Sequence, residues 1–226
     1  MSHGDSESPV IWKVGDSHGP AAGTWLAQFR PEWDVKNHTR SGSTSQHWVD
    51  GMLQDMINAE PVVADVVTVM LAGNDIAQGR TPADIAENLA TIVARLHAIG
   101  VPQVLMGRQG FATDLDPNDL ALDGEPWFDK LCRLTLGAYE VHEIQKTFDL
   151  PKPAYVDTWM KDSADYIWSD LTHEQRNPTT QGGNVFAGLA ALHHHPERDG
   201  LGSWKVAKAW ELGIEKRLAL LGIPGQ

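Results

Sequence analysis

The chain has 226 residues, of which 42% are hydrophobic and 21% charged, as is ordinary for a folded globular protein. Its formal net charge of −12 argues against nucleic acid or an anionic membrane as the main partner, since both need clustered lysine and arginine. The single cysteine, Cys132, excludes an intrachain disulfide framework, and no run approaches the roughly 18 apolar residues of a membrane span.

The length predicts one large domain over residues 9–226, preceded by a flexible amino-terminal tail at residues 1–8. The amino terminus is polar and acidic and lacks the basic and apolar segments of a secretion signal. The default expectation is therefore a cytoplasmic protein, with a secreted mature form left open. The sequence predicts no particular oligomeric state.

Short apolar runs alternate with longer amphipathic segments, which is typical of repeated βα units around a parallel sheet. Five strands are expected, at Val10–Val14, Trp33–Asn37, Val66–Leu71, Gln103–Met106 and Ala154–Asp157. The third is the clearest, because its continuous β-branched run suits burial on both faces of a sheet. The pattern predicts an α/β fold with a five-stranded parallel sheet.

Helices are expected in the intervals between these strands, at residues 45–58, 81–100 and 127–147, and again from about residue 203. The second is the best marked, with Thr81 as its N-cap and a proline at its first helical position. Residues 113–125 are rich in Asp, Asn, Pro and Gly and are expected to form a surface loop.

The first expected strand ends in Gly15-Asp16-Ser17, which leaves a serine at its carboxyl end. Ligands of open α/β sheets bind just beyond this edge, where a serine can act as a nucleophile. Gly4-Asp5-Ser6 has the same three residues but lies in the polar tail. Only the second copy follows a strand, so Ser17 is the candidate nucleophile.

Two further loops follow predicted strands and open at the same edge of a right-handed parallel sheet. One contains Gly42 and the other contains Asn74. Acyl transfer needs N–H donors that hold the developing oxyanion. The Ser17 N–H, the Gly42 N–H and the Asn74 side-chain amide are the candidate donors. A side chain at position 42 would block the approach of the carbonyl, and the asparagine donates without adding charge.

These linked motifs resemble the SGNH (GDSL-type) hydrolase family over roughly the first third of the chain. The matching segments are Gly15-Asp16-Ser17, Asn37 through Thr44, and Gly73-Asn74-Asp75. The resemblance implies a flavodoxin-like three-layer α/β/α sandwich with five parallel strands. It also implies that Ser17 is the nucleophile and that Ser17, Gly42 and Asn74 form the oxyanion hole.

The resemblance further implies a carboxylate and a histidine near the carboxyl terminus, spaced as Asp-x-x-His. Asp170 and His173 have this spacing. The histidine would accept the serine proton, while the carboxylate would fix its tautomer. His195 is the alternative base, because family members usually continue through a proline-rich turn into the last helix and Pro196 follows it. Leu192 stands three residues before His195, so a carboxylate from elsewhere would have to orient it.

No metal or cofactor is expected. The consecutive histidines 193–195 point in divergent directions, and no carboxylate or cysteine cluster has metal-ligand spacing. The expected activity is that of a serine esterase that hydrolyses small acyl or acetyl esters through an acyl-enzyme. Its expected partner is a small-molecule or carbohydrate ester, and the nine tryptophans are compatible with sugar stacking. The alternatives are an acyltransferase with the same triad and an inactive carbohydrate-binding module.

Overall fold

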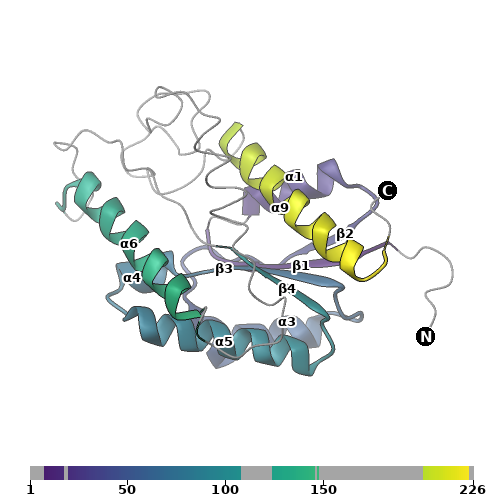
Figure 1. Ribbon diagram of the computed structural model, residues 1–226, viewed down its shortest axis with the longest axis horizontal. Helices are drawn as coiled ribbons and strands as arrows, with labels where there is room; N and C mark the ends of the chain where they lie inside the picture. The colour runs from purple at the N-terminus through teal and green to yellow at the C-terminus, as the bar shows by residue number, and fades with distance from the viewer. Residues whose placement is uncertain (1–7, 18–19, 108–123, 146, 148–200, 224–226) are drawn as a thin grey trace.

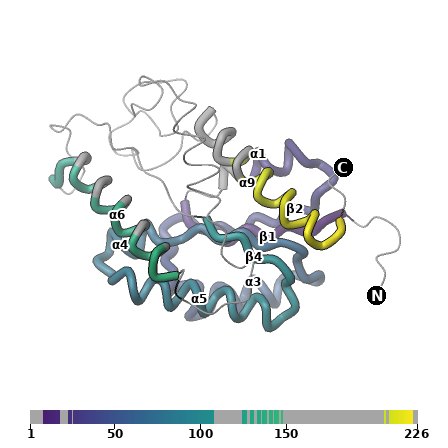
Figure 2. Tube along the Cα trace, viewed as in Figure 1, coloured from purple at the N-terminus to yellow at the C-terminus, as the bar shows by residue number. Residues whose placement is uncertain are grey.

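The computed structural model describes residues 8–17, 20–107, 124–145, 147 and 201–223. These segments are the coloured parts of the chain in Figure 1, and Figure 2 follows the same Cα trace. Residues 1–7 of the expected tail, most of the expected loop at 113–125 and the expected strand at 154–157 lie outside them. The division into a tail and a single domain therefore remains a prediction.

Four parallel strands form the sheet, in the order β2-β1-β3-β4. They are β1 (Val10–Gly15), β2 (Asp34–Asn37), β3 (Val66–Met70) and β4 (Gln103–Met106), which confirms the first four expected strands to within one residue at each end. The central strands β1 and β3 are buried almost throughout, because helices cover both faces of the sheet.

Helices lie on both sides of this sheet and complete an α/β fold (Figure 1). On one side, α1 (Pro20–Phe29) packs against α9 (Leu201–Leu220), and α9 also contacts β3 and β4. On the other side lie α3 (Leu53–Ala59) and α5 (Pro82–Ala98). The helix α6 (Trp127–Gln145) contacts α5 and runs obliquely to it in Figures 1 and 2.

The helix expected at residues 45–58 is divided into three parts. It begins as α2 (Ser45–His47), continues as the π-helical segment η1 (Trp48–Met52) and ends as α3. Thr44 caps its start: its hydroxyl accepts the His47 N–H at 3.3 Å, while its own N–H donates to His47 Nδ1 at 3.2 Å. The helix is therefore where the sequence predicts it, but its middle is wider than an α-helix, a feature that is frequent near functional sites.

The last helix lies unusually close to the sheet at Trp210. Gly107 follows β4, and a Cβ atom there would lie 2.3 Å from the Trp210 ring. On β1, the Lys13 ammonium lies over the same ring, 4.8 Å from its centroid. Lys13 is only 2% exposed, and burial lowers the pKa of its amine from 10.5 to about 7. A basic side chain is thus enclosed between the central strand and α9.

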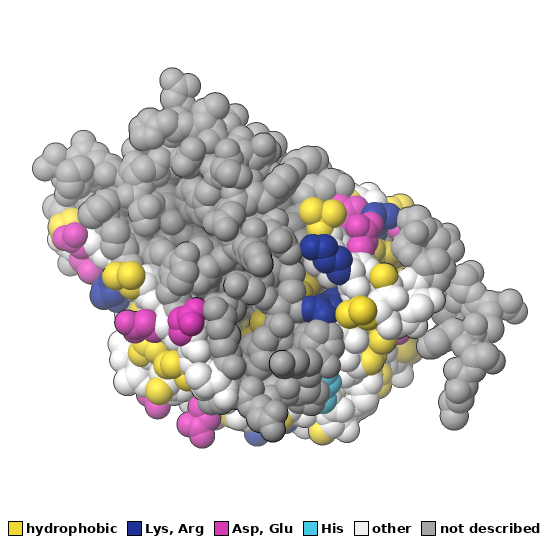
Figure 3. All heavy atoms as spheres, in the orientation of Figure 1, with side chains coloured by type: hydrophobic (Ala, Val, Ile, Leu, Met, Phe, Trp, Pro, Cys, Tyr) yellow, Lys and Arg dark blue, Asp and Glu magenta, His cyan; other side chains and the backbone are white. Residues whose placement is uncertain are grey.

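The described surface mixes both signs of charge. On the face in Figure 3, acidic side chains lie beside lysine and arginine side chains and between hydrophobic ones. Within the described ranges, no helix combines the length and the apolar character that a membrane crossing requires.

Candidate active site

Ser17 stands two residues after the end of β1, at the carboxyl edge of the sheet. It is half-buried, and Asp16 before it is buried, with 1% of its surface exposed. Because β1 pairs with β2 on one side and β3 on the other, the loops after both neighbours leave the sheet next to Ser17. These are the loops that carry Gly42 and Asn74.

Gly42 occupies a tight turn after β2. The Ser43 N–H donates to the Arg40 carbonyl at 3.1 Å, and Gly42 between them has a φ of +76°. Only glycine adopts this conformation without strain. A Cβ atom at this position would meet open space, so the backbone conformation rather than crowding within the described residues requires the glycine.

This turn is fastened to the end of β1. The Gly15 carbonyl accepts the Arg40 N–H at 2.9 Å and the Ser43 hydroxyl at 3.3 Å. The indole N–H of Trp48 in turn donates to the Ser43 hydroxyl oxygen at 3.1 Å. The loop with Gly42 is therefore attached to the chain at Gly15, which is two positions before Ser17 in the sequence.

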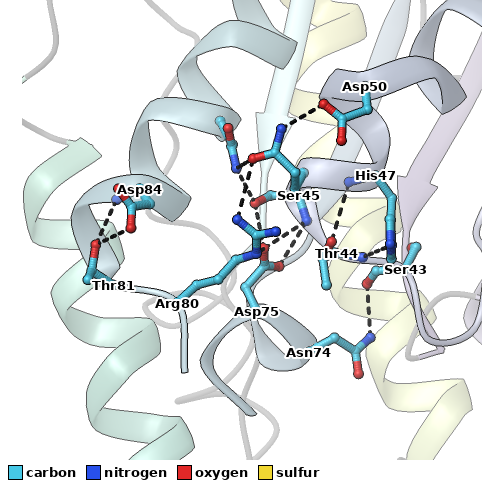
Figure 4. Close-up of polar contacts among 12 residues, drawn as sticks. Ser43, Thr44, Ser45, His47, Asp50, Asn74, Asp75, Arg80, Thr81 and Asp84 are labelled. Atoms are coloured by element: carbon cyan, nitrogen blue, oxygen red, sulfur yellow. Dashed lines mark hydrogen bonds and ion pairs between the residues drawn. The ribbon is translucent and has the colours of Figure 1, made fainter. Parts of the chain in front are cut away.

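Asn74 lies in α4 (Gly73–Ala77), a short helix that begins after β3. Its side-chain amide donates to the Ser43 carbonyl at 2.9 Å (Figure 4). The amide carries a second hydrogen, which this contact does not use. Ala72, just before the helix, has a φ of +138°, a strained conformation of the kind that clusters at active sites.

Asp75, the next residue of α4, holds the same segment through its carboxylate (Figure 4). The Ser45 N–H lies 2.9 Å from Oδ2 and 3.1 Å from Oδ1, and the Ser45 hydroxyl donates to Oδ1 at 2.7 Å. Asp75 is 0% exposed, and burial raises the pKa of its carboxyl group above 3.8. Hydrogen bonds from Ser45 and the charge of Arg80 oppose this rise.

A second layer of polar side chains surrounds the Asp75–Ser45 contact. The Asn88 amide donates to the Ser45 hydroxyl oxygen at 3.1 Å, and the Arg80 Nε lies 3.7 Å from Asp75 Oδ1. Gln46 accepts from both, at 3.3 Å from the Asn88 amide and 3.4 Å from Arg80 Nη1. The segment after Gly42 is thus bound from α4 and α5 together.

The structure brings together the loops of three predicted site residues: Ser17, Gly42 and Asn74. The predicted Asp170, His173 and alternative His195 lie outside the described residues. Sequence reasoning missed the connecting role of Ser43 and Ser45. The available signal was the run of hydroxyl residues Ser43-Thr44-Ser45 directly after the glycine.

A serine at the end of a central strand, with a glycine turn and an asparagine on the two neighbouring strand-end loops, is an arrangement that ester hydrolysis can use. Comparison with known proteins agrees, because residues 4–175 match the GDSL-like lipase/acylhydrolase family. The match spans more than half of the chain, and the chain belongs to this family of hydrolases. No protein among those with curated functions matches it in sequence.

Solved structures share the fold. A GDSL-like lipase from Bacteroides thetaiotaomicron aligns with a TM-score of 0.62 at 15% identity, covering 96% of this chain and 92% of that one. An acetylxylan esterase from Geobacillus stearothermophilus, solved as a catalytic mutant, aligns at 0.56 and 15%, covering 93% and 95%. A Bacillus subtilis protein aligns at 0.61 and 16%, covering 97% of this chain but only 58% of its own length.

Proposed function

We propose that this hydrolase is a serine esterase that cleaves small acyl esters through an acyl-enzyme on Ser17. The observation that carries the proposal is the set of hydrogen bonds around Ser43. This residue donates to the carbonyl at the end of β1 and accepts from the Asn74 amide, so it links the three strand-end loops next to Ser17. Membership of the GDSL-like family supports the same chemistry.

In the proposed reaction, the Ser17 oxygen bonds to the ester carbonyl carbon while its proton passes to a histidine. The carbonyl electron pair moves onto oxygen, and N–H groups of Ser17, Gly42 and Asn74 stabilise the resulting oxyanion. Collapse of this intermediate breaks the bond to the alcohol oxygen, which takes the proton back from the histidine. Water then repeats these steps on the acyl-serine and releases the acid.

We infer that His173 is the base, with Asp170 as its carboxylate partner. The family match supports this choice because it ends at residue 175, so it includes both residues and leaves His195 outside. Substitution His173→Ala is expected to lower kcat by about 10⁴-fold, the scale of a lost triad histidine. His195→Ala is expected to change it less than about tenfold, and the opposite ranking in p-nitrophenyl acetate hydrolysis would move the base to His195.

The nucleophile is tested with a matched pair of serines. Ser17→Ala is expected to abolish p-nitrophenyl acetate hydrolysis, with a loss of at least about 10⁴-fold. Ser6→Ala changes the other Gly-Asp-Ser copy and is expected to leave kcat/KM at the wild-type value. Retained turnover in the Ser17 variant, or an equal loss in both, would contradict the assignment.

Acetyl groups on carbohydrates are the proposed substrate class. The support is the shared fold of an acetylxylan esterase, together with the nine tryptophans of the chain. Acetylated xylan oligosaccharides should be hydrolysed faster than sugar esters of longer acyl chains at the same concentration, measured as acid released per unit time. An acyltransferase would instead move the acetyl group to an added sugar more often than to water, and a binding module would retain the sugar with no turnover.

A further inference from the structure

We propose that Asp75 is a positioning residue for the oxyanion hole, because its buried carboxylate fixes the segment that follows Gly42. The inference rests on the proposed esterase function and assigns a role to a side chain that does not itself contact the substrate. Figure 4 shows Asn74 and Asp75 together on α4, each directed at the chain segment Ser43–Ser45.

The first argument is that two adjacent residues hold two nearby points of one segment. The Asn74 amide donates to the carbonyl of Ser43, and the Asp75 carboxylate accepts from the backbone and hydroxyl groups of Ser45. Because the two held residues, Ser43 and Ser45, are two positions apart, these contacts fix both the position and the direction of the chain. Gly42, immediately before this segment, is therefore fixed relative to the helix that supplies Asn74.

The second argument concerns the N–H group of Ser45. Ser45 is the first residue of α2, and the N–H groups at the start of a helix have no acceptor within the helix. The Asp75 carboxylate provides that acceptor across 30 positions of sequence. A carboxylate is also favoured at this end of a helix, because the backbone dipoles present a partial positive charge there.

The third argument is the orientation of the carboxylate. Both of its oxygens lie within 3.1 Å of the Ser45 N–H, and Oδ1 also accepts the hydroxyl, which itself accepts the Asn88 amide. Arg80 lies 3.7 Å from the same oxygen. Partners on several sides leave the carboxylate little freedom to rotate. The buried acid is therefore a rigid support rather than a mobile surface charge.

The consequence for catalysis follows from geometry. An oxyanion donor must sit at hydrogen-bond distance from the transition-state oxygen, and a displacement of about 1 Å can lower the rate about 10²-fold. Loss of the Asp75 support frees the Ser43–Ser45 segment and misplaces the Gly42 N–H. The Asn74 amide also loses the fixed position of its Ser43 acceptor. The ground-state ester depends less on these donors, so kcat should fall more than KM rises.

The test compares Asp75→Asn with Asp84→Asn, a matched change at an exposed aspartate. Among the described contacts, the Asp84 carboxylate accepts only the Thr81 hydroxyl, in the cap of α5. In Asp75→Asn, one acceptor oxygen becomes a donor that faces the Ser45 N–H. With p-nitrophenyl acetate, this variant is expected to lose about 10²-fold in kcat with KM within about twofold. Asp84→Asn is expected to keep both constants.

Hydrogen–deuterium exchange supplies an independent readout. The Ser45 amide is expected to exchange faster in Asp75→Asn than in wild type and at the wild-type rate in Asp84→Asn. Should Asp75→Asn fail to fold, Ser45→Ala removes the two contacts of the hydroxyl, to Asp75 and Asn88, and keeps the backbone N–H contact with Asp75. This variant is expected to lose about tenfold in kcat. An active wild type with unchanged kcat or unchanged Ser45 exchange in these variants overturns this inference alone. A wild type without ester turnover overturns the proposed function first.

Discussion

Two buried charges of opposite sign, Asp75 and Lys13, show how differently one small fold treats ionisable groups. Asp75 lies at the carboxyl edge of the sheet, where Ser45 and Arg80 provide hydrogen-bond donors and a positive charge. Lys13 lies within the sheet, where its described contact is the face of the Trp210 ring. Burial favours the neutral form of each group, so it raises the pKa of the acid and lowers the pKa of the amine.

The difference lies in what opposes burial. Three hydrogen bonds and a nearby guanidinium counteract the desolvation of Asp75, whereas desolvation is the cause that acts on the pKa of Lys13. A buried charge with several donors stabilises the position of its neighbours. A buried charge beside an aromatic ring gains a cation–π attraction but still opposes folding while it is protonated. The first therefore organises the site, and the second makes the stability depend on pH.

The largest expected effect comes from removing the acid. Asp75→Ala leaves the Ser45 N–H and hydroxyl without their acceptor in a buried place. We expect the free energy of unfolding to fall by about 3 kcal/mol, measured by urea denaturation. Asp84→Ala, at the exposed cap of α5, should lower it by no more than about 1 kcal/mol. Equal losses in the two variants would remove the distinction between a buried anchor and an ordinary cap.

The opposite sign is expected for the buried amine. Lys13→Met keeps the length and apolar stem of the side chain and removes the charge, so the free energy of unfolding at pH 7 should rise by about 2 kcal/mol. Lys36→Met, on the partly exposed edge strand β2, changes a lysine whose side chain is 39% exposed and should shift stability by less than about 0.5 kcal/mol. A destabilised Lys13 variant would contradict this account of the enclosed amine.

The buried Lys13 amine also makes the free energy of unfolding depend on pH. Between pH 7 and 10.5 the unfolded chain binds a proton that the folded amine has released, so stability should rise as the pH increases through this window. Below pH 7 both states are protonated, and the full penalty of the buried charge remains. Lys13→Met should remove this contribution to the slope, as measured by denaturation between pH 7 and 10. An unchanged slope would show that other groups cause it.

The first four strands were predictable because their residues are β-branched or apolar in short runs bounded by turn residues. The positions of Ser17, Gly42 and Asn74 followed from those strand ends. The π-helical segment Trp48–Met52 was not predictable, since an apolar stripe fixes the buried face of a helix but not an extra residue per turn. The sequence pattern predicts one uniform helix there, whereas the structure has a π-helical segment between two α-helical ones.

Long-range polar contacts were also beyond the sequence pattern. Asp75 and Ser45 are 30 positions apart, and short polar side chains after a strand are typical of any turn. A lysine inside an apolar strand predicts a side chain that faces solvent, because alternating apolar and polar residues are the usual signal of a half-buried strand. Lys13 is covered by Trp210 of α9, which lies nearly 200 positions later in the sequence.

The central claim is that Ser17 is the nucleophile, and covalent labelling tests it most directly. Wild-type protein treated with a fluorophosphonate should gain the mass of one adduct, and peptide mapping should place it on Ser17. Ser17→Ala should gain none, while Ser6→Ala should label at the wild-type rate. An adduct on another residue, or undiminished labelling of Ser17→Ala, would contradict the account.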